Sequence, residues 1–350
     1  MTLVQRTNPS KIVMLRALLG GAGLCLLMAS IAVAMTLGHT DIMLVNVRDI
    51  VTNHLGLTDI PVKNNKDAIV WEDRLPRSLV AAASGICLAL CGLILQSLLR
   101  NPLADPYILG VSSGASTGAV LVGMLGLGGG ALGLSGGAFL GALLAFASVL
   151  LIARWTRGAA SSFILAGVAS TQFFSALTSV IIFAFADSDE ARGVMFWLLG
   201  SLEGVRWNQA GLLVSVALLC FAFCMFFAKT LDILTLGEDM AGSLGVNTQV
   251  VRWLLLGATA LVTSAVVSMI GAVGFVGLVI PHIARLLLGH HHRLLIPASA
   301  TIGALFMVWV DTFSRLLFSP SALPIGVSTA LIGVPFFTWV LLKKNKTTAA

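Results

Sequence analysis

The sequence predicts an all-α polytopic membrane protein of about ten transmembrane helices, which form a single domain over residues 1–350. Hydrophobic residues make up 57% of the chain and charged residues only 10%, whereas soluble domains carry about 25% charged residues. The apolar residues also gather in long charge-free stretches, and a helix of about 20 such residues crosses a bilayer. Lipid is therefore the expected solvent for most of the chain.

The charge-free stretches supply the predicted helices in order along the chain. One helix each is expected at residues 17–40, 78–99, 158–186, 207–228, 294–310 and 316–342. The stretch 106–153 is long enough for two helices, with a turn at residues 126–130. Residues 253–293 are also too many for one helix. We expect a turn near residues 271–274 that divides this segment into a full span and a shorter one.

The first stretch has some features of a secretory signal peptide. It begins with basic residues and contains Ala32-Val33-Ala34, which resembles a cleavage site. Its apolar run is longer than the usual run of about 7–15 residues. We therefore expect it to remain as a transmembrane helix.

The charge pattern predicts the orientation in the membrane. Both terminal segments, residues 1–16 and 343–350, are basic and are expected in the cytoplasm, which requires an even number of helices. With that orientation most of the 21 Lys and Arg residues fall on the cytoplasmic side, as the positive-inside rule requires. The net charge of +6 then follows from orientation, so it does not indicate nucleic-acid binding.

Two polar loops are long enough to have structure of their own. Residues 38–71 form the predicted outer loop, which we expect to hold a short surface helix. Residues 229–252 form the predicted cytoplasmic loop.

Within the spans, glycines recur every fourth residue in two neighbouring helices, which predicts close helix packing. These glycines are Gly110, Gly114 and Gly118 in the first helix, and Gly133, Gly137 and Gly141 in the second.

Cysteine and histidine residues do not predict a metal site. The cysteines lie in apolar stretches, where a free cysteine behaves as a small hydrophobic residue. They are Cys25, Cys87, Cys91, Cys220 and Cys224. His290, His291 and His292 would point about 100° apart on a helix, so we expect a polar cytoplasmic cap. Pro281-His282 has no nucleophile or carboxylate near it in sequence and is expected to end a helix.

The sequence contains no energy source of its own. A Gly-x-x-x-x-Gly-Lys-[Ser/Thr] phosphate-binding loop is absent, so ATP hydrolysis by this chain is not expected. Ionisable residues are almost absent from the spans, which disfavours coupling to an ion gradient. Asp311 and Arg315 lie four residues apart at the outer end of the ninth span, where they can pair on one helix face. An ion-coupled secondary transporter or channel stays open as the alternative, and an intramembrane enzyme as a third class.

Three arginines are expected at the outer end of the spans. Arg74 and Arg77 stand just before the second span, and Arg315 ends the ninth. Such side chains can extend to the membrane interface while their stems stay in the apolar region. Alternatively, their guanidinium groups can bind carboxylates of an extracytoplasmic partner.

A series of motifs occurs in order along the chain. The motifs are Arg74-Leu75-Pro76-Arg77; Arg100-Asn101-Pro102-Leu103-Ala104-Asp105-Pro106, followed by Leu109-Gly110; Phe196-Trp197-Leu198-Leu199-Gly200; the segment from Gly274 and Gly277 through Pro281, His282 and Arg285; Asp311 with Arg315; Leu323-Pro324-Ile325-Gly326; and Gly333-Val334-Pro335-Phe336. Together they resemble the membrane permeases of ABC importers for iron–siderophore complexes, haem and vitamin B12. The resemblance covers nearly the whole chain.

The resemblance implies a fold like that of the vitamin B12 importer permease, in the bacterial cytoplasmic membrane. A second permease, either a second copy or a paralogue, would complete a dimer that encloses the translocation path. Two ABC ATPase subunits would bind ATP and Mg²⁺, and a substrate-binding protein would dock from outside. This chain would bind no cofactor or metal and would be no enzyme. By family base rate the first expected cargo is a ferric siderophore, followed by haem or cobalamin, moved by alternating access.

The resemblance also implies roles for particular residues. Arg74, Arg77 and Arg315 would face acidic residues on the two lobes of the binding protein. The segment 237–245 would contact the ATPase, and a cytoplasmic neck would lie near Ser161 and Ser162. Residues 187–201 resemble a short outer gate helix. The positions expected to couple to the ATPase are Gly237, Glu238, Ala241, Leu244 and Gly245.

Overall fold

The computed structural model describes residues 9–125, 133–156, 160–185, 195–317 and 322–348, and every regular element in these ranges is helical. Six helices are long and apolar enough to cross a membrane, and four shorter helices are also apolar. These helices occupy the ten segments that the charge-free stretches predict. The predicted fold class is therefore confirmed.

The helices of the bundle follow the predicted order. They are α1 (Pro9–Thr36), α4 (Leu75–Leu98), α5 (Val111–Leu125), α6 (Gly133–Trp155), α7 (Ala160–Phe185), α9 (Trp207–Phe226), α12 (Thr248–Ile270), α13 (Val276–Leu288), α14 (His292–Leu317) and α15 (Ile325–Thr348). We call the end of the bundle that the charge pattern assigns to the outside the outer end, and the opposite end the cytoplasmic end. The predicted turn at residues 126–130 lies outside the described residues.

Short elements connect the long helices. The outer loop holds α2 (Leu44–His54) and α3 (Asn64–Ala68), so the predicted surface helix is confirmed. A π-helical segment η1 (Ile69–Arg74) then leads directly into α4, so the helical path is continuous from Asn64 to Leu98. The second span therefore begins before Arg74 and not after Arg77. At the cytoplasmic end lie α10 (Ala228–Thr235) and α11 (Glu238–Ser243), and η2 (Pro106–Leu109) is a 3-10 turn between α4 and α5.

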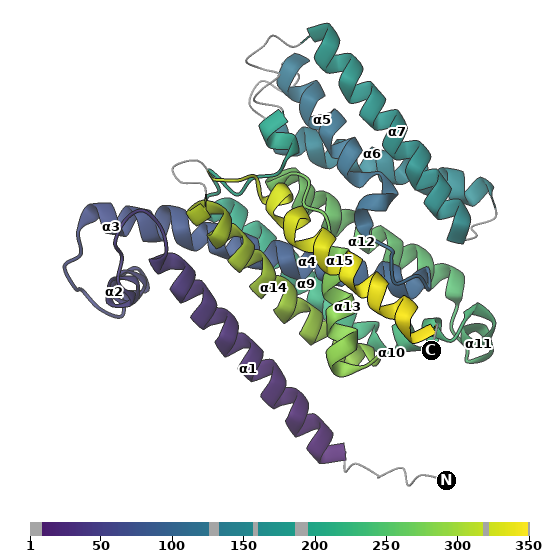
Figure 1. Ribbon diagram of the computed structural model, residues 1–350, viewed down its shortest axis with the longest axis horizontal. Coiled ribbons are helices and arrows are strands. Elements are labelled where there is room, and N and C mark those ends of the chain that lie inside the picture. The colour runs from purple at the N-terminus through teal and green to yellow at the C-terminus, as the bar shows by residue number, and fades with distance from the viewer. Residues whose placement is uncertain (1–8, 126–132, 157–159, 186–194, 318–321, 349–350) are drawn as a thin grey trace.

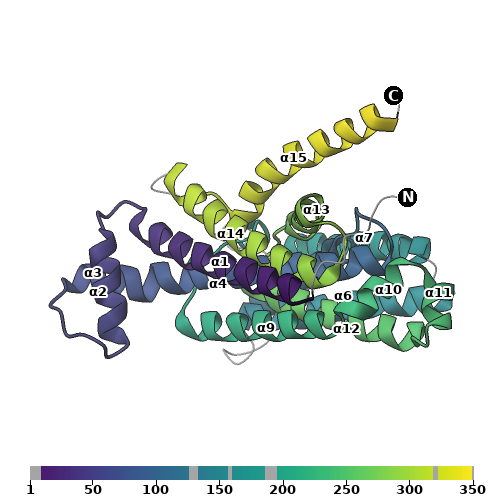
Figure 2. The ribbon, with the colours of Figure 1, turned by 90° about the horizontal axis from the view of Figure 1, so that it is seen from below.

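Helix α4 lies at the centre of the bundle. It packs against α14, α9, α13 and α12, and nearly all of its side chains are buried. Figure 1 shows α5, α6 and α7 as a group to one side of this centre, and α1 at the opposite edge beside α14. Figure 2 shows α15 diverging from the other helices. The apolar side chains Leu331 and Val334 on α15 are exposed.

Glycine allows the central helices to approach closely. A Cβ atom at Gly85 would overlap the backbone of Gly303 on α14, and one at Gly92 would overlap the carbonyl of Gly277 on α13. The predicted stripes in α5 and α6 also meet. A Cβ atom at Gly118 would overlap the Gly137 carbonyl. In lipid, where helix association gains little from hydrophobicity, such backbone contact is a main source of packing energy.

The expectation that a helix ends at Pro281 is wrong. Helix α13 continues through Pro281 to Leu288, and it ends at Gly289, which has a φ of +82°. Proline cannot donate to the carbonyl four residues earlier, here that of Gly277. The side chain of Gln96 on α4 compensates, because its Nε2 donates to the Gly277 carbonyl at 3.1 Å. The sequence around Pro281 does not reveal a donor that lies 181 residues away.

The contact between α4 and α13 leads to a first prediction. Replacement Gly92→Ala should lower the free energy of unfolding by about 1–3 kcal/mol, because the new methyl group forces two backbones apart. The matched control is Gly257→Ala on α12, where a Cβ atom meets nothing within 4 Å. Thermal unfolding of both variants in the same detergent measures the difference. Equal stabilities would contradict the close contact.

Candidate functional site

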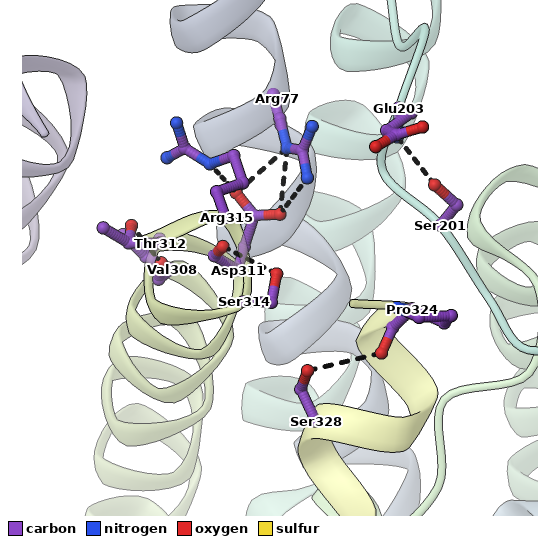
Figure 3. A network of polar contacts seen from close by, with 10 residues as sticks. All are labelled: Arg77, Ser201, Glu203, Val308, Asp311, Thr312, Ser314, Arg315, Pro324 and Ser328. Atoms are coloured by element: carbon purple, nitrogen blue, oxygen red, sulfur yellow. Dashed lines mark hydrogen bonds and ion pairs between the residues drawn. The ribbon is translucent and has the colours of Figure 1, made fainter. Parts of the chain in front are cut away.

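A buried ion pair joins α4 to α14 at the outer end. Arg77 binds Asp311 through two nitrogens: Nη2 lies 2.7 Å from Oδ1, and Nε lies 2.9 Å from Oδ1 and 3.1 Å from Oδ2 (Figure 3). Arg77 is only 7% exposed and Asp311 only 1%. Two-pronged guanidinium–carboxylate contacts of this kind are strong and directional. This pair therefore defines how the outer ends of the two helices meet.

Arg315 completes the same cluster. Its Nε lies 3.2 Å from Asp311 Oδ2, so the pairing expected from their spacing is confirmed. Its Nη2 atom is buried and has no hydrogen-bond partner among the described residues. Arg77, the stronger partner of Asp311, was missed as such because it lies 234 residues away. Asp73 and Glu203 face the cluster from exposed positions. One buried carboxylate thus serves two guanidinium groups, and one of these keeps a free donor.

Arg74 has a different partner. It is buried, and its Nη1 donates to the carbonyl of Met35 at 2.6 Å, in the last turn of α1. A cation at a helix C-terminus is favourable because the free carbonyls there carry negative partial charge. Arg74 therefore fastens α1 to the start of the central helix. The docking role of Arg74, Arg77 and Arg315 stays a prediction, and of the three only Arg315 is partly exposed.

Three segments meet by backbone hydrogen bonds near the outer end. Ser201 N–H donates to the Ile270 carbonyl at 2.9 Å, and Ile325 N–H donates to the Gly200 carbonyl at 3.0 Å. Gly326 N–H donates to the Leu199 carbonyl at 3.2 Å. The motifs around Gly200 and Gly326 are therefore parts of one junction. The predicted outer gate helix is described only in part: residues 195–198 are helical, and residues 187–194 lie outside the described residues.

An apolar hollow of about 550 Å³ opens beside this junction. Its walls are Leu198, Leu199, Ala272 and one face of α15, which includes Gly326 and Val334. Pro324 immediately precedes α15, and its carbonyl accepts a hydrogen bond from Ser328 Oγ at 3.3 Å (Figure 3). Pro335 lies in the interior of α15 and also lines the hollow.

The segment after α4 does not form the cytoplasmic loop that the charge pattern predicts. Asp105 and Pro106 are buried against Gly277: a Cβ atom there would lie 2.9 Å from Pro106 Cδ and 3.0 Å from the carbonyl oxygen of Leu88. Asp105 Oδ1 accepts from Tyr107 N–H at 2.8 Å and caps η2, and Gly110 ends it with a φ of +75°. Non-helical backbone at membrane depth is tolerated where protein surrounds it. Asp105 therefore does not belong with the charges of the cytoplasmic surface.

The remaining motif residues surround this re-entrant segment. Arg285 Nη1 donates to Gln96 Oε1 at 2.6 Å, so Gln96 links Arg285 to the Gly277 carbonyl. Asn101 Oδ1 accepts from Leu103 N–H at 2.9 Å and shapes the turn that contains Pro102. Gly274 lies just before α13, and His282 lies within it, next to Pro281. The structure thus brings together motifs that lie far apart in sequence.

The predicted coupling segment forms a short helix at the cytoplasmic end. Gly237 and Gly245 bound it with φ angles of +114° and +82°, which favour glycine. Ala241 is a buried residue of α11, and its carbonyl accepts from Val246 N–H at 3.0 Å. Leu244 is exposed, and so are its neighbours Leu236 and Met240. This uncovered apolar surface is suited to a protein partner. The Glu238 side chain lies outside the description.

His292 is not part of a polar cytoplasmic cap. It is only 2% exposed, and its Nδ1 lies 2.7 Å from Asp232 Oδ1 while its Nε2 lies 2.7 Å from Ser97 Oγ. Neighbouring His291 is exposed, as the cap requires. The expectation failed for His292 because its partners come from α10 and α4. Sequence reasoning therefore missed a chain of three polar side chains that runs from the partly exposed Asp232 to the buried His292 and Ser97.

The predicted neck residues lie at the start of α7. Ser162 Oγ donates to the Thr156 carbonyl at 3.4 Å, which joins the start of α7 to the residue that follows α6. The side chain of Ser161 lies outside the description. The neck role of both residues stays a prediction.

The chain is similar to known transport proteins along nearly its whole length. The profile of the FecCD transport family matches residues 26–343. The iron(3+)-hydroxamate import system permease protein FhuB of Bacillus subtilis is 36% identical over 327 residues, which cover 93% of this chain and 83% of that protein. The vitamin B12 import system permease protein BtuC of Vibrio cholerae is 41% identical over 278 residues, which cover 79% and 83%.

One solved structure has the same fold. It is described as an inward-facing conformation of a metal-chelate type ABC transporter, and it superposes with a TM-score of 0.80 at 29% sequence identity. The match covers 93% of this chain and 99% of that chain. The two chains therefore correspond from end to end.

The Arg77–Asp311 pair leads to a second prediction. Replacement Asp311→Asn should lower the free energy of unfolding by about 3–5 kcal/mol, because it leaves two guanidinium groups without their buried counter-charge. The double replacement Arg77→Met/Asp311→Leu should recover part of this loss, since it removes the main buried charge pair together. Asp59→Asn, at an exposed position in the outer loop, is the control. The measurement is thermal unfolding in detergent. If Asp311→Asn were as stable as this control, the structural role of the pair would be contradicted.

Proposed function

This chain belongs to the FecCD transport family, and from that membership we propose that it is the membrane-spanning permease subunit of an ATP-binding-cassette importer in the cytoplasmic membrane. The observation that carries the proposal is the family match over residues 26–343. The end-to-end similarity to a metal-chelate type transporter supports it. The same membership disfavours the alternative of an ion-coupled transporter or channel.

The proposed cargo is an iron chelate, first of all a ferric siderophore, with haem or cobalamin as the next candidates. Relatives of similar identity are named for iron(3+)-hydroxamate and for vitamin B12 import. Both cargoes are bulky chelates. The hollow beside α15 is lined mainly by apolar side chains, which supports weak contact with a large ligand along the path. Weak contact suits a cargo that must be released on the other side.

Energy for transport would come from two partner ATPase subunits that bind ATP and Mg²⁺. The absence of a phosphate-binding loop from the sequence supports this division of labour. The exposed apolar side chains of Leu236, Met240 and Leu244 would contact the ATPase. A second permease would cover exposed apolar side chains such as Phe183 on α7 and Leu331 on α15. The path would then lie between the two permeases.

A substrate-binding protein would dock at the outer end. We assign the direct contact to Arg315, because its side chain is partly exposed whereas Arg74 and Arg77 are buried. Arg77 is occupied by Asp311, and Arg74 by the carbonyl of Met35. These two arginines would hold the docking surface in place. A carboxylate on the binding protein would complete the cluster with a charge-assisted hydrogen bond.

Transport would proceed by alternating access. Nucleotide binding would close the ATPase pair and move the coupling segment. The helices would then pass between outward-open and inward-open arrangements. A ligand or partner drives such a change only through different contact energies with the two states. The Ser161–Ser162 region would form the cytoplasmic constriction.

Reconstitution tests the proposed function. The permease in proteoliposomes with its ATPase and binding protein should accumulate a ⁵⁵Fe-labelled ferric hydroxamate only when ATP is present. Cyanocobalamin is the second cargo to be tried. Liposomes with the permease alone should accumulate neither. ATP-independent uphill uptake by the permease alone would refute the proposal.

The docking surface has its own test. Replacement Arg315→Gln should weaken binding of the substrate-binding protein at least about tenfold, because a charge-assisted hydrogen bond contributes about 1.5–3 kcal/mol. Membrane insertion should be unchanged, since Arg77 still forms its ion pair with Asp311. Arg48→Gln is the control, because Arg48 lies on the outer surface with a side chain that is 67% exposed. Equal affinities in a surface-binding assay would exclude Arg315 from the contact.

A further inference from the structure

We propose that Asp232 and His292 are positioning residues that fasten the coupling segment to the paired helices α4 and α14. Through this fastening, a displacement of α10 and α11 reaches the arginine cluster at the outer end. The inference rests on the proposed function, because it assigns the route by which the ATPase moves the permease.

The fastening is a chain of hydrogen bonds across three helices. Asp232 Oδ1, on α10, accepts from the backbone N–H of His292 at 2.9 Å and lies 2.7 Å from its Nδ1. His292 Nε2 lies 2.7 Å from Ser97 Oγ, on α4. His292 and Ser97 are buried, whereas the side chain of Asp232 is 32% exposed. The chain thus runs from the cytoplasmic surface into the core.

The Asp232 carboxylate also caps helix α14. His292 is the first residue of this helix, and its backbone N–H has no acceptor within the helix. A carboxylate at a helix N-terminus is stabilised by the free N–H groups and by the helix dipole. Pro297 removes another hydrogen bond from the second turn. The start of α14 therefore depends on an acceptor that α10 supplies.

Helices α4 and α14 are fastened to each other at three levels. Ser97 and His292 join them at the cytoplasmic end, and Arg77 and Asp311 join them at the outer end. Between these levels Gly85 and Gly303 bring the two backbones into contact. A helix of the length of α14 spans about 39 Å. Joined in this way, the two antiparallel helices move as one body between the membrane faces.

The coupling segment reaches this body through α10. Helix α11 packs on α10 and on α12, and α10 packs on α4 and α14. Leu231 and Leu234 of α10 are buried. Apolar contacts of this kind are not directional, so they would let α10 slide along its neighbouring helices. The Asp232–His292 contact does fix the position of α10, because hydrogen bonds are directional. Coupling between distant sites is carried by such packed elements and polar networks.

The test compares four variants of the fastening with two controls. Asp232→Ala removes both hydrogen bonds to His292. His292→Gln removes the imidazole contacts with Asp232 and Ser97 but keeps the backbone N–H, and the double variant removes both side chains. Asp232→Asn keeps an oxygen acceptor for the His292 N–H and serves as a conservative rescue. Lys229→Gln and His291→Gln change exposed residues on α10 and beside α14. All variants are assembled with the ATPase and the binding protein in proteoliposomes.

Two quantities are measured in every variant. The first is the amount of ⁵⁵Fe-labelled ferric hydroxamate or cyanocobalamin transported per ATP hydrolysed, with whichever probe the wild type accumulates. The second is hydrogen exchange of the amides of α10 and of the first turn of α14. Asp232→Ala and His292→Gln should lower the transport ratio at least about fivefold, within the usual range of coupling between sites. Exchange should rise about tenfold or more in these two segments alone.

The outcomes separate the inference from the proposed function. The double variant should be no worse than Asp232→Ala, Asp232→Asn should be milder, and the controls should match the wild type within about twofold. A wild-type complex that transports either probe, with variants that keep the same ratio, would overturn the inference alone. The inference would also be overturned if the controls lowered the amount transported per ATP hydrolysed as much as the fastening variants do. A wild type that shows no ATP-driven transport of either probe would overturn the proposed function and the inference with it.

Discussion

The buried Arg77–Asp311 pair is the contact on which the arrangement of the other helices depends. A charge without its partner is very costly in a lipid-surrounded interior, so α4 and α14 can cross only in the register that closes this pair. The same register brings Gly85 against Gly303 and Ser97 against His292. Helices α9, α12 and α13 also pack on α4, so they assemble on a helix whose register with α14 the ion pair sets.

Polar side chains elsewhere in the bundle also join helices that are distant in sequence. Gln96 supplies the donor that Pro281 lacks, and Arg74 binds the last turn of α1. Each of these contacts satisfies a backbone carbonyl that would otherwise be unpaired away from water, which is costly in a bilayer. The apolar residues make the chain insoluble in water without specifying which helix lies beside which. The few polar residues make that choice.

The sequence was sufficient to predict where the membrane-spanning helices lie along the chain, but not which helices pack against each other. Charge-free stretches predicted all ten helices, because the thickness of the bilayer sets their length and the cost of burying charge sets their ends. The helix end at Pro281 and the cap at His292 were wrong for one shared reason. In both cases a side chain on a distant helix supplies the missing bond, and a single sequence carries no signal of what lies opposite. The burial of Asp105 was missed in the same way, since a short polar loop and a re-entrant segment have the same composition. The exposed residues around Leu244 were identified by resemblance, and no periodicity would have singled them out.

The distribution of charge along the membrane normal fits a permease whose conformational change is driven by partner proteins. Ionisable groups lie mainly near the two ends: Arg315 keeps an unused donor at the outer end, and Asp232 remains half-exposed at the cytoplasmic end. Between them the fastened helices α4 and α14 carry close backbone contacts. A body of this kind transmits displacement without a charge of its own at the middle of the membrane. An ion-driven transporter requires a titratable group at membrane depth that loads and releases the coupling ion. Asp105 is a buried carboxylate at that depth, but it caps η2 by accepting a hydrogen bond from Tyr107 N–H.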